Sequence, residues 1–373
     1  YTLGARIAQT PHTASPKGGS TYYSVRNSAQ LSNALSQTFS LISAQMSAGA
    51  AVSVVAAEDR TSNRLFRARF ESQSWRGYLE SFVLPYQNGA TPVWEAGNLL
   101  SSRSAASRTI FTSTTGTNKV DLVTSNAASL VTPLAAVDVA DATQIIDYTR
   151  GSTVTGTRDR GGWKLGDIVD ASPLMVGKPS GFKNYLGYSS FRAANASRPE
   201  MLYVAANDGM LHCFDLTTGN EQWGYVPKSV LPRLRNLMST TYCHEFFVNL
   251  SPVDYDIYIG GAWKTVLIGG QERGGNGLFA LHVTNPAANS VSVLWDVAPT
   301  QLKGSWNSPT LIRDRTLNAH VLAVGSGLDA ASSVANLLVL NPGSGAVLSM
   351  FAGGSLTGVL GPRLLVGFGF SCL

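Results

Sequence analysis

The feature that most constrains this chain is the stretch 201–226, which has the pattern of three short strands joined by two tight turns. An apolar run at 201–206 precedes Asn-Asp-Gly at 207–209, and these residue types tolerate the positive φ angles of a hairpin turn. The remaining parts are a strand at 210–214, a turn at 215–219 and a strand at 221–226 that contains Trp223. One such sheet cannot bury both of its faces, so the stretch predicts further copies.

Two later segments repeat the pattern. The first has apolar runs at 265–270, 278–283 and 291–295, and the second has them at 320–325, 336–340 and 346–351. If Asp215, His282 and Asn341 are equivalent turn positions, the repeats lie 67 residues (282 − 215) and 59 residues (341 − 282) apart. A four-stranded propeller blade needs only about 40 to 50 residues. We therefore expect an all-β propeller, in which radial repetition protects the sheet edges, with inserts between the strands.

Four regions follow along the chain. Residues 1–27, rich in Gly, Ser, Thr and Pro, predict a linker from a missing upstream region, because no initiator Met or signal peptide precedes them. Residues 28–150 predict a first blade region that begins with a short helix, 29–46, capped by Ser28. Residues 151–362 predict the blades with their inserts, and 363–373 an atypical tail. Within the first blade region we expect strands at 51–57, 65–70, 75–84 and 110–112 and a second helix at 142–148.

Composition excludes several classes of protein. Only 14% of residues are charged, the net charge is +5, and the basic residues are scattered. A nucleic-acid surface needs a basic run interleaved with exposed aromatic side chains, and the sequence has none. It also has no apolar run of about 18 residues, so no transmembrane segment is expected.

The cysteines and histidines give little support for a metal site. The count of three cysteines is odd, so at least one thiol is unpaired within this chain. Cys213 lies in an apolar strand and favours a buried free thiol, although a disulfide with Cys243 stays open for an oxidising compartment. His212 and Cys213 are neighbours on one strand and point to opposite faces. Cys243, His244 and Glu245 could donate ligands from a loop, but zinc needs three or four ligands in a suitable geometry. Assembling such a site would require His212 or Cys213 to come close.

Catalytic chemistry has no support either. Gly325-Ser326-Gly327 lacks the nucleophile elbow of serine hydrolases, and the glycines at 274–277 join two strands, so they do not form a phosphate-binding helix start. The carboxylates Asp167, Asp170 and Asp208 lie beside turn residues, where Asp bonds its own backbone. The insert 228–248 is the largest, and loops on a rigid scaffold commonly carry recognition. We predict a partner-contact loop there, with Tyr242, His244 and Glu245 as its candidate residues.

A family resemblance narrows the function. The run 165–177, LGDIVDASPLMVG, resembles the start of the C-terminal propeller of the PilY1/PilC family of type IV pilus proteins. Further runs resemble that family in the same order, and their joint spacing is more specific than any one of them. They are Trp75–Leu79, Trp94–Ala96, Arg108–Thr112, Tyr203–His212, Tyr225–Pro227 and Trp263–Gly270.

The resemblance implies a non-enzymatic type IV pilus assembly factor or pilus-tip adhesin that promotes pilus extension and surface attachment. It implies secretion through the periplasm to the cell surface or pilus tip, as a fimbrial protein. It also implies minor pilins or the pilus-tip complex as partners, and a host-surface receptor as a further one.

The sequence departs from the family pattern in two places. The family's calcium loop of the D-x-D-x-D-G type is missing, and Asp254-Tyr255-Asp256 is the nearest run, so no cofactor is expected in this chain. After Pro362 we would expect that loop and further blades, but the chain reads RLLVGFGFSCL and stops. We therefore expect an incomplete or reduced ring that exposes a sheet edge.

Two alternatives remain from the residues themselves. The blade pattern also resembles quinoprotein repeats, which would make the chain a dehydrogenase that binds pyrroloquinoline quinone. Such enzymes often carry vicinal cysteines, which this chain lacks. The other alternative is a generic assembly scaffold of the outer membrane.

Overall fold

The computed structural model describes residues 52–55, 64–87, 89–179, 187–304, 307–314, 319–329 and 334–352. All of them belong to one compact unit, Met46–Leu373. The predicted linker 1–27, the predicted helix 29–46 and the predicted tail 363–373 lie outside the described residues. Whether the ring is incomplete or reduced therefore stays a prediction.

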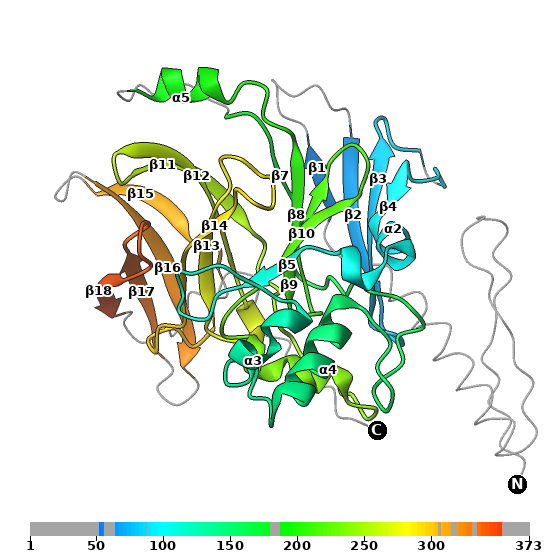
Figure 1. Ribbon diagram of the computed structural model, residues 1–373. Helices are drawn as coiled ribbons and strands as arrows, with labels where there is room; N and C mark the ends of the chain where they lie inside the picture. The colour runs from blue at the N-terminus through cyan, green and yellow to red at the C-terminus, as the bar shows by residue number, and fades with distance from the viewer. Residues whose placement is uncertain are drawn as a thin grey trace, which may run out of the picture. The chain divides into compact units, whose positions relative to one another are not determined.

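The described residues form four sheets, of which the first, third and fourth have four strands each and the second has six (Figure 1). The first contains β1 (Val52–Val55), β2 (Arg64–Glu71), β3 (Arg76–Val83) and β4 (Trp94–Glu95). The second contains β7 (Leu174–Val176), β8 (Met201–Ala206), β9 (Met210–Asp215) and β10 (Glu221–Val226). The third contains β11 (Val253–Ile259), β12 (Ala262–Gly270), β13 (Leu278–His282) and β14 (Ser292–Val297). The fourth contains β15 (Thr310–Asp314), β16 (Ala319–Asp329), β17 (Val334–Leu340) and β18 (Val347–Ala352).

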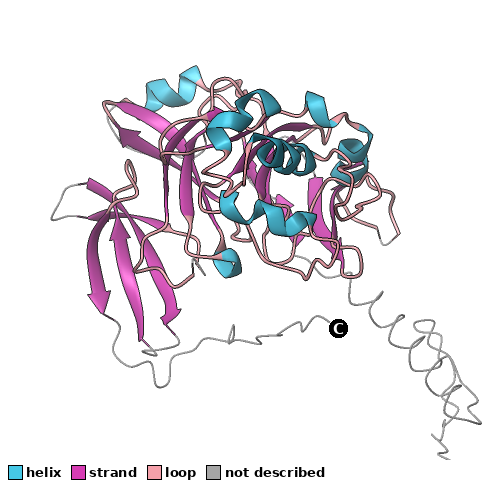
Figure 2. Ribbon diagram, turned by 60° about the horizontal axis from the view of Figure 1, so that its bottom comes forward, coloured by secondary structure: helices cyan, strands magenta, loops and turns pink. Residues whose placement is uncertain are grey.

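Helices lie in the connections between the strands (Figure 2). The α-helices are α2 (Ala96–Ser102), α3 (Ala127–Leu130), α4 (Val139–Arg150) and α5 (Tyr188–Ala194). The 3-10 helices are η1 (Ala105–Ser107), η2 (Thr124–Asn126), η3 (Leu231–Met238) and η4 (Glu272–Gly274). The described chain is thus mostly strands with some helices, and of these helices the sequence predicted only α4. Asp138 caps α4 by accepting from the Asp141 N–H, and Gly151 ends it at φ 102°, a conformation that glycine adopts without strain.

The predicted strand–turn–strand unit is confirmed almost to the residue. β8, β9 and β10 coincide with the predicted strands, and the turn after β9 is closed by Asp215 Oδ1, which accepts from the N–H groups of Thr217 and Thr218. In the fourth sheet Asn341 Oδ1 accepts from the Gly343 N–H. The side chains at these two predicted turn positions therefore accept backbone hydrogen bonds of their own turns in the same way. The sequence did not predict the first strand of each later sheet.

The second sheet has more strands than a four-stranded propeller blade. β5 (Ile110–Thr112) pairs in parallel with β10, with Gly224 opposite Ile110, and β6 (Val120–Asp121) continues the sheet beyond β5. A parallel pair requires a crossover of a dozen or more residues, which the intervening chain supplies. β5 and β6 precede the boundary predicted at residue 150, so the sheet spans that boundary.

Neighbouring sheets bury one another's faces. On β12 and β13 the side chains of Leu267 and Phe279 belong to the core shared with the first and second sheets, whereas those of Ile268 and Ala280 belong to the core shared with the fourth. This alternation is the period of two that a strand imposes on its side chains. The third sheet therefore buries both faces, as the repeat predicted.

A tryptophan on the last strand of each of the first three sheets joins it to the next sheet. Trp223 on β10 donates its indole N–H to the Pro286 carbonyl oxygen at 2.9 Å, and Trp295 on β14 donates to Pro342 at 2.8 Å. Trp94 on β4 donates in the same way to Leu216 at 3.2 Å. Each acceptor lies in the turn after the third strand of the following sheet, or next to it, so the contact repeats with the sheets.

The cysteines differ from one another. Cys213 is a buried free thiol, as the sequence favoured, and burial raises its pKa well above the usual value. Cys243 is disulfide-bonded. The pairing of these two cysteines that the sequence left open is therefore not formed.

Candidate functional site

The insert 228–248 packs against the turn at 207–209. Beyond β10 the chain enters η3, whose Leu234 contacts the turn so closely that a Cβ on Gly209 would lie 2.8 Å from it. At the other end of the insert, the Phe247 N–H donates to Asn207 Oδ1 at 2.9 Å. Seven buried side chains of the insert join the core: Val230, Leu231, Leu234, Leu237, Met238, Phe247 and Val248. Deleting the whole insert would therefore remove part of the core.

His244 holds this insert in place through contacts of its ring. Its ring stacks on Trp75 at 3.7 Å between centroids, and its Nε2 lies 2.8 Å from Asp167 Oδ2. The side chain is only 3% exposed. Asp167 Oδ2 also accepts from the Asn207 side-chain amide at 2.7 Å. His244 therefore ties the insert to the chain before β7 and to the turn before β9.

The other two predicted contact residues lie beside it. The Arg158 guanidinium lies 4.2 Å from the centre of the Tyr242 ring, and Glu245 donates its N–H to the Tyr242 hydroxyl oxygen at 3.1 Å. Arg233 pairs with the Glu245 carboxylate at 2.8 Å, and both side chains are one-third exposed. The three predicted residues are thus brought together, and their bonds run within the protein. A role in partner contact stays a prediction.

Two of the three carboxylates that the sequence assigned to turns do other work. Asp208 accepts from the Met210 N–H of its own turn at 3.2 Å, as predicted. Asp167 makes the cross-links to His244 and Asn207, and Asp170 accepts from Asn249 at 2.7 Å. The sequence missed these links because the partners lie 40 to 79 residues away.

A buried chain of charges lies next to the turn. Arg108 forms a bidentate pair with Glu221, at 2.8 Å from Nε and 2.7 Å from Nη2. Glu221 Oε1 lies 2.9 Å from His212 Nδ1, and Asp208 lies 3.1 Å from His212 Nε2. All four side chains are buried. Arg108, Glu221, His212 and Asp208 therefore alternate in charge once the imidazole is protonated.

The geometry requires that protonation. Both ring nitrogens of His212 face carboxylate oxygens, and only the imidazolium donates from both. Burial disfavours the charged ring, but Asp208 and Glu221 outweigh burial and raise the pKa of His212 to about 9. Burial also opposes the charged form of Glu221, yet Arg108 and His212 hold its pKa well below the usual range. The quartet is internally neutral and contributes to the structure.

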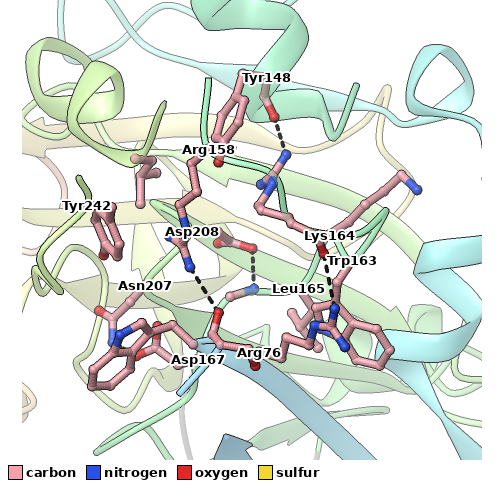
Figure 3. Close-up of a pocket in the computed structure, with 15 residues that line it drawn as sticks. Arg76, Tyr148, Arg158, Trp163, Lys164, Leu165, Asp167, Asn207, Asp208 and Tyr242 are labelled. Atoms are coloured by element: carbon pink, nitrogen blue, oxygen red, sulfur yellow. Dashed lines mark hydrogen bonds between the residues drawn. The ribbon is translucent and has the colours of Figure 1, made fainter. Parts of the chain in front are cut away.

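A pocket opens beside this quartet (Figure 3). It is small and in part open to solvent, and Tyr242 of the insert forms one wall. Four of its lining residues are cationic and two are acidic. The cations are Arg76, Arg158, Arg160 and Lys164, and the acids are Asp167 and Asp208. Sequence reasoning missed this cluster because its cations come from two separate segments.

Among the described residues, no three His, Cys, Asp or Glu side chains come together in a way that could hold a metal ion. Asp256 lies on β11 and accepts hydroxyl bonds of 2.6 Å from Tyr188 and Thr265. Within the same part of the chain no helix is long and apolar enough to cross a membrane.

The repeated sheets, with tryptophans that join each to the next, define a β-propeller domain. Residues 165–315 match the sequence family described as the PilY1 beta-propeller domain. The chain is 32% identical over 345 residues to a type IV pilus biogenesis factor PilY1 homolog of Xylella fastidiosa, covering 87% of this chain and 27% of the relative. It is 33% identical over 344 residues to the type IV pilus biogenesis factor PilY1 of Pseudomonas aeruginosa strain PAK, covering 83% and 29%.

The chain therefore belongs to the PilY1 family. It spans a little over a quarter of the length of these relatives. Among solved structures, the crystal structure of the Pseudomonas aeruginosa PilY1 C-terminal domain is 33% identical, with a TM-score of 0.41, covering 50% of this chain and 38% of that one. The family predicted from the sequence is confirmed.

Proposed function

We propose that this chain is the propeller region of a non-enzymatic type IV pilus assembly factor that promotes pilus extension and surface attachment. The observation that carries the proposal is the identity of about one-third, over most of the chain, to proteins named as type IV pilus biogenesis factors. In this proposal the chain acts at the cell surface or pilus tip, after secretion through the periplasm, and needs no cofactor of its own.

The proposed partners are minor pilins or the pilus-tip complex, with a host-surface receptor as a further one. The exposed part of the insert 228–248, chiefly Ser239, Thr240 and Thr241, lies next to Tyr242 and Glu245. In this proposal Tyr242 and Glu245 contact the partner directly, because they are partly exposed. His244 is a positioning residue, since its buried ring holds the insert against Trp75 and Asp167.

A domain exchange tests the pilus role. The matching segment of the resident PilY1 in Pseudomonas aeruginosa is replaced by this chain, and surface pili and twitching motility are measured against a strain that lacks the segment. We expect the exchange to restore pili at least in part. A hybrid protein that is folded, secreted and present at normal levels, but restores no pili, would contradict the proposal.

Point variants test the insert separately. Glu245→Gln keeps the size of the side chain and removes its charge, and Thr241→Arg adds bulk at an exposed position. We expect both to reduce pili without lowering the melting temperature by more than a few degrees. Gln222→Ala, an exposed position on β10 outside the insert, is the matched control. Normal piliation in both insert variants would contradict a role of the insert in partner contact. It would not contradict the proposed role of the chain in pilus assembly.

A further inference from the structure

The hydroxyl of Tyr148 is buried and has no hydrogen-bond partner among the residues that the structure describes. Tyr148 lies on α4, is 2% exposed and lines the pocket described above. Figure 3 shows its ring pointing from the helix toward Arg158, with the hydroxyl at the end that faces the pocket. Buried hydroxyl groups in proteins almost always have a partner, because burying one without a partner costs free energy. The hydroxyl is therefore free to donate a hydrogen bond to an acceptor in the pocket.

The cations around this hydroxyl also lack an anionic partner. Arg158 donates to the Ser74 carbonyl oxygen at 2.9 Å, and Arg160 donates to the Tyr148 carbonyl oxygen at 2.5 Å. Arg76 donates weakly to the Arg160 carbonyl oxygen at 3.4 Å, and its guanidinium lies 5.6 Å from the centre of the Trp163 ring. Among the described residues, none of these three guanidinium groups is paired with a carboxylate.

The two carboxylates of the pocket are already engaged. Asp208 accepts from the Gly166 N–H at 2.9 Å and faces the protonated His212. Asp167 is held by His244 and Asn207. Burial lowers the pKa of Arg160 although Tyr148 and Asp208 oppose it, and burial together with the Arg108 and Arg160 guanidinium groups lowers the pKa of Lys164. The pocket thus holds an excess of positive charge that its own residues do not neutralise.

We propose that this pocket binds a carboxylate group, held by Arg158, Arg160 and the Tyr148 hydroxyl, with Arg76 at its edge. The planar fork of a guanidinium matches the two oxygens of a carboxylate, and a charge-assisted bond from a tyrosine hydroxyl adds a third donor. The group is a monoanion, because Asp167 and Asp208 line the same pocket and repel a phosphate dianion. The rings of Trp75, Trp163 and Tyr242 flank the pocket and suit an apolar segment next to the carboxylate.

The carboxylate has two possible sources, a free small acid and the C-terminus of a peptide, which share this chemistry. Titration calorimetry of the 373-residue chain with sodium acetate, against sodium chloride at equal ionic strength, tests the site itself. A short apolar peptide with a free C-terminus, and the same peptide amidated, distinguishes the sources. These measurements need no pilus assay, so their failure is distinguishable from a failure of the proposed pilus role.

Three variants make the test specific. Tyr148→Phe keeps the ring on which the Arg160 guanidinium lies, at 4.1 Å, and removes only the hydroxyl. We expect it to weaken carboxylate binding about tenfold, the effect of one hydrogen bond to a charged group. Arg160→Gln should weaken it further. Arg235→Gln, at a surface position paired with Asp141, should leave binding unchanged.

The outcomes distinguish whether the pocket binds a carboxylate and which source supplies it. Saturable binding of acetate, or of the free peptide but not the amidated one, that is weakened by Tyr148→Phe supports the site and identifies its source. Equal binding by Tyr148→Phe and the unaltered chain overturns the proposal, as does a heat signal for acetate that matches that of chloride. Tighter binding of inorganic phosphate than of acetate overturns the choice of a monoanion. Because Tyr148→Phe removes an unsatisfied hydroxyl and no packing, it should fold, which circular dichroism verifies.

Discussion

The indole N–H of Trp223 donates to the carbonyl oxygen of Pro286, 63 residues further along the chain, at 2.9 Å. Trp223 lies on the last strand of the second sheet, and Pro286 lies just after the third strand of the third. Trp295 and Pro342 repeat this relationship one sheet later. A single donor on a large ring therefore fixes both the distance and the register between adjacent sheets, because the ring fills the space and the N–H selects one carbonyl.

Trp223→Phe should destabilise the chain by roughly 2–4 kcal/mol. The buried Pro286 carbonyl loses its donor, and the smaller ring leaves part of a fully buried volume empty. Urea unfolding followed by circular dichroism measures the loss. Gln222→Ala, the exposed neighbour on β10, should change the free energy of unfolding by less than about 0.5 kcal/mol. Equal stability of the two variants would show that the indole does not join the sheets.

Gly219→Ala separates close packing from backbone strain. Gly219 has φ +74°, and a Cβ there would lie 2.5 Å from the Trp94 ring. Gly156 has φ +81° with nothing within 4 Å of a Cβ, so Gly156→Ala meets only the backbone penalty of about 1–2 kcal/mol. We expect Gly219→Ala to lower the free energy of unfolding by more than Gly156→Ala does. Equal losses in urea titrations would mean that Trp94 moves away without cost.

Local patterns made most of the strands predictable. Asn207-Asp208-Gly209 and Asp215 carry their own turn chemistry, so β8, β9 and β10 could be predicted from the residues alone. β5 could be predicted as a strand, but its parallel pairing with β10 could not, because no local pattern specifies a partner more than a hundred residues away. The short 3-10 helix η3 has few turns, so its apolar residues gave no clear helical period.

The site was less predictable than the fold. The insert and its residues Tyr242, His244 and Glu245 could be singled out as polar residues in a long connection. The contacts of Asp167 and Trp75 with these residues could not be predicted, because they depend on how three connections between strands pack together. The pocket could not be predicted for the same reason, since Tyr148 comes from a helix and Arg158 and Arg160 come from the loop that follows it.

His212 should make stability depend on pH above neutrality. Its folded-state pKa is about 9 and the unfolded value is 6.5, so the protonated ring stabilises the fold fully below pH 6.5. That stability is lost as the pH rises from 6.5 through 9, by an amount on the order of 3 kcal/mol. Urea unfolding at pH 6.5, 7.5, 8.5 and 9.5 measures the fall. His212→Gln is less stable throughout but should lack this fall, and an equally steep fall in that variant would contradict the assignment.

Asp296→Asn should stabilise the chain at pH 8. Asp296 is buried on β14, and its Oδ2 accepts from the Tyr225 hydroxyl and the Lys228 N–H, both at 2.6 Å. Burial outweighs these two bonds and raises the pKa of Asp296 to about 6, above its ordinary value of 3.8. A raised carboxyl pKa means that stability is lost as the pH rises from 3.8 through 6, because the charged form must then be buried.

The amide oxygen of Asn can accept the same two bonds without the charge. We therefore expect the Asn variant to exceed the unaltered chain by about 2–3 kcal/mol at pH 8, and by much less at pH 4. Asp296→Ala is the contrasting variant, since it leaves both donors buried without an acceptor and should be destabilised at either pH. Urea unfolding at the two pH values measures all three proteins. A loss of stability in Asp296→Asn at pH 8 would mean that the carboxylate charge itself holds Tyr225 and Lys228 in place.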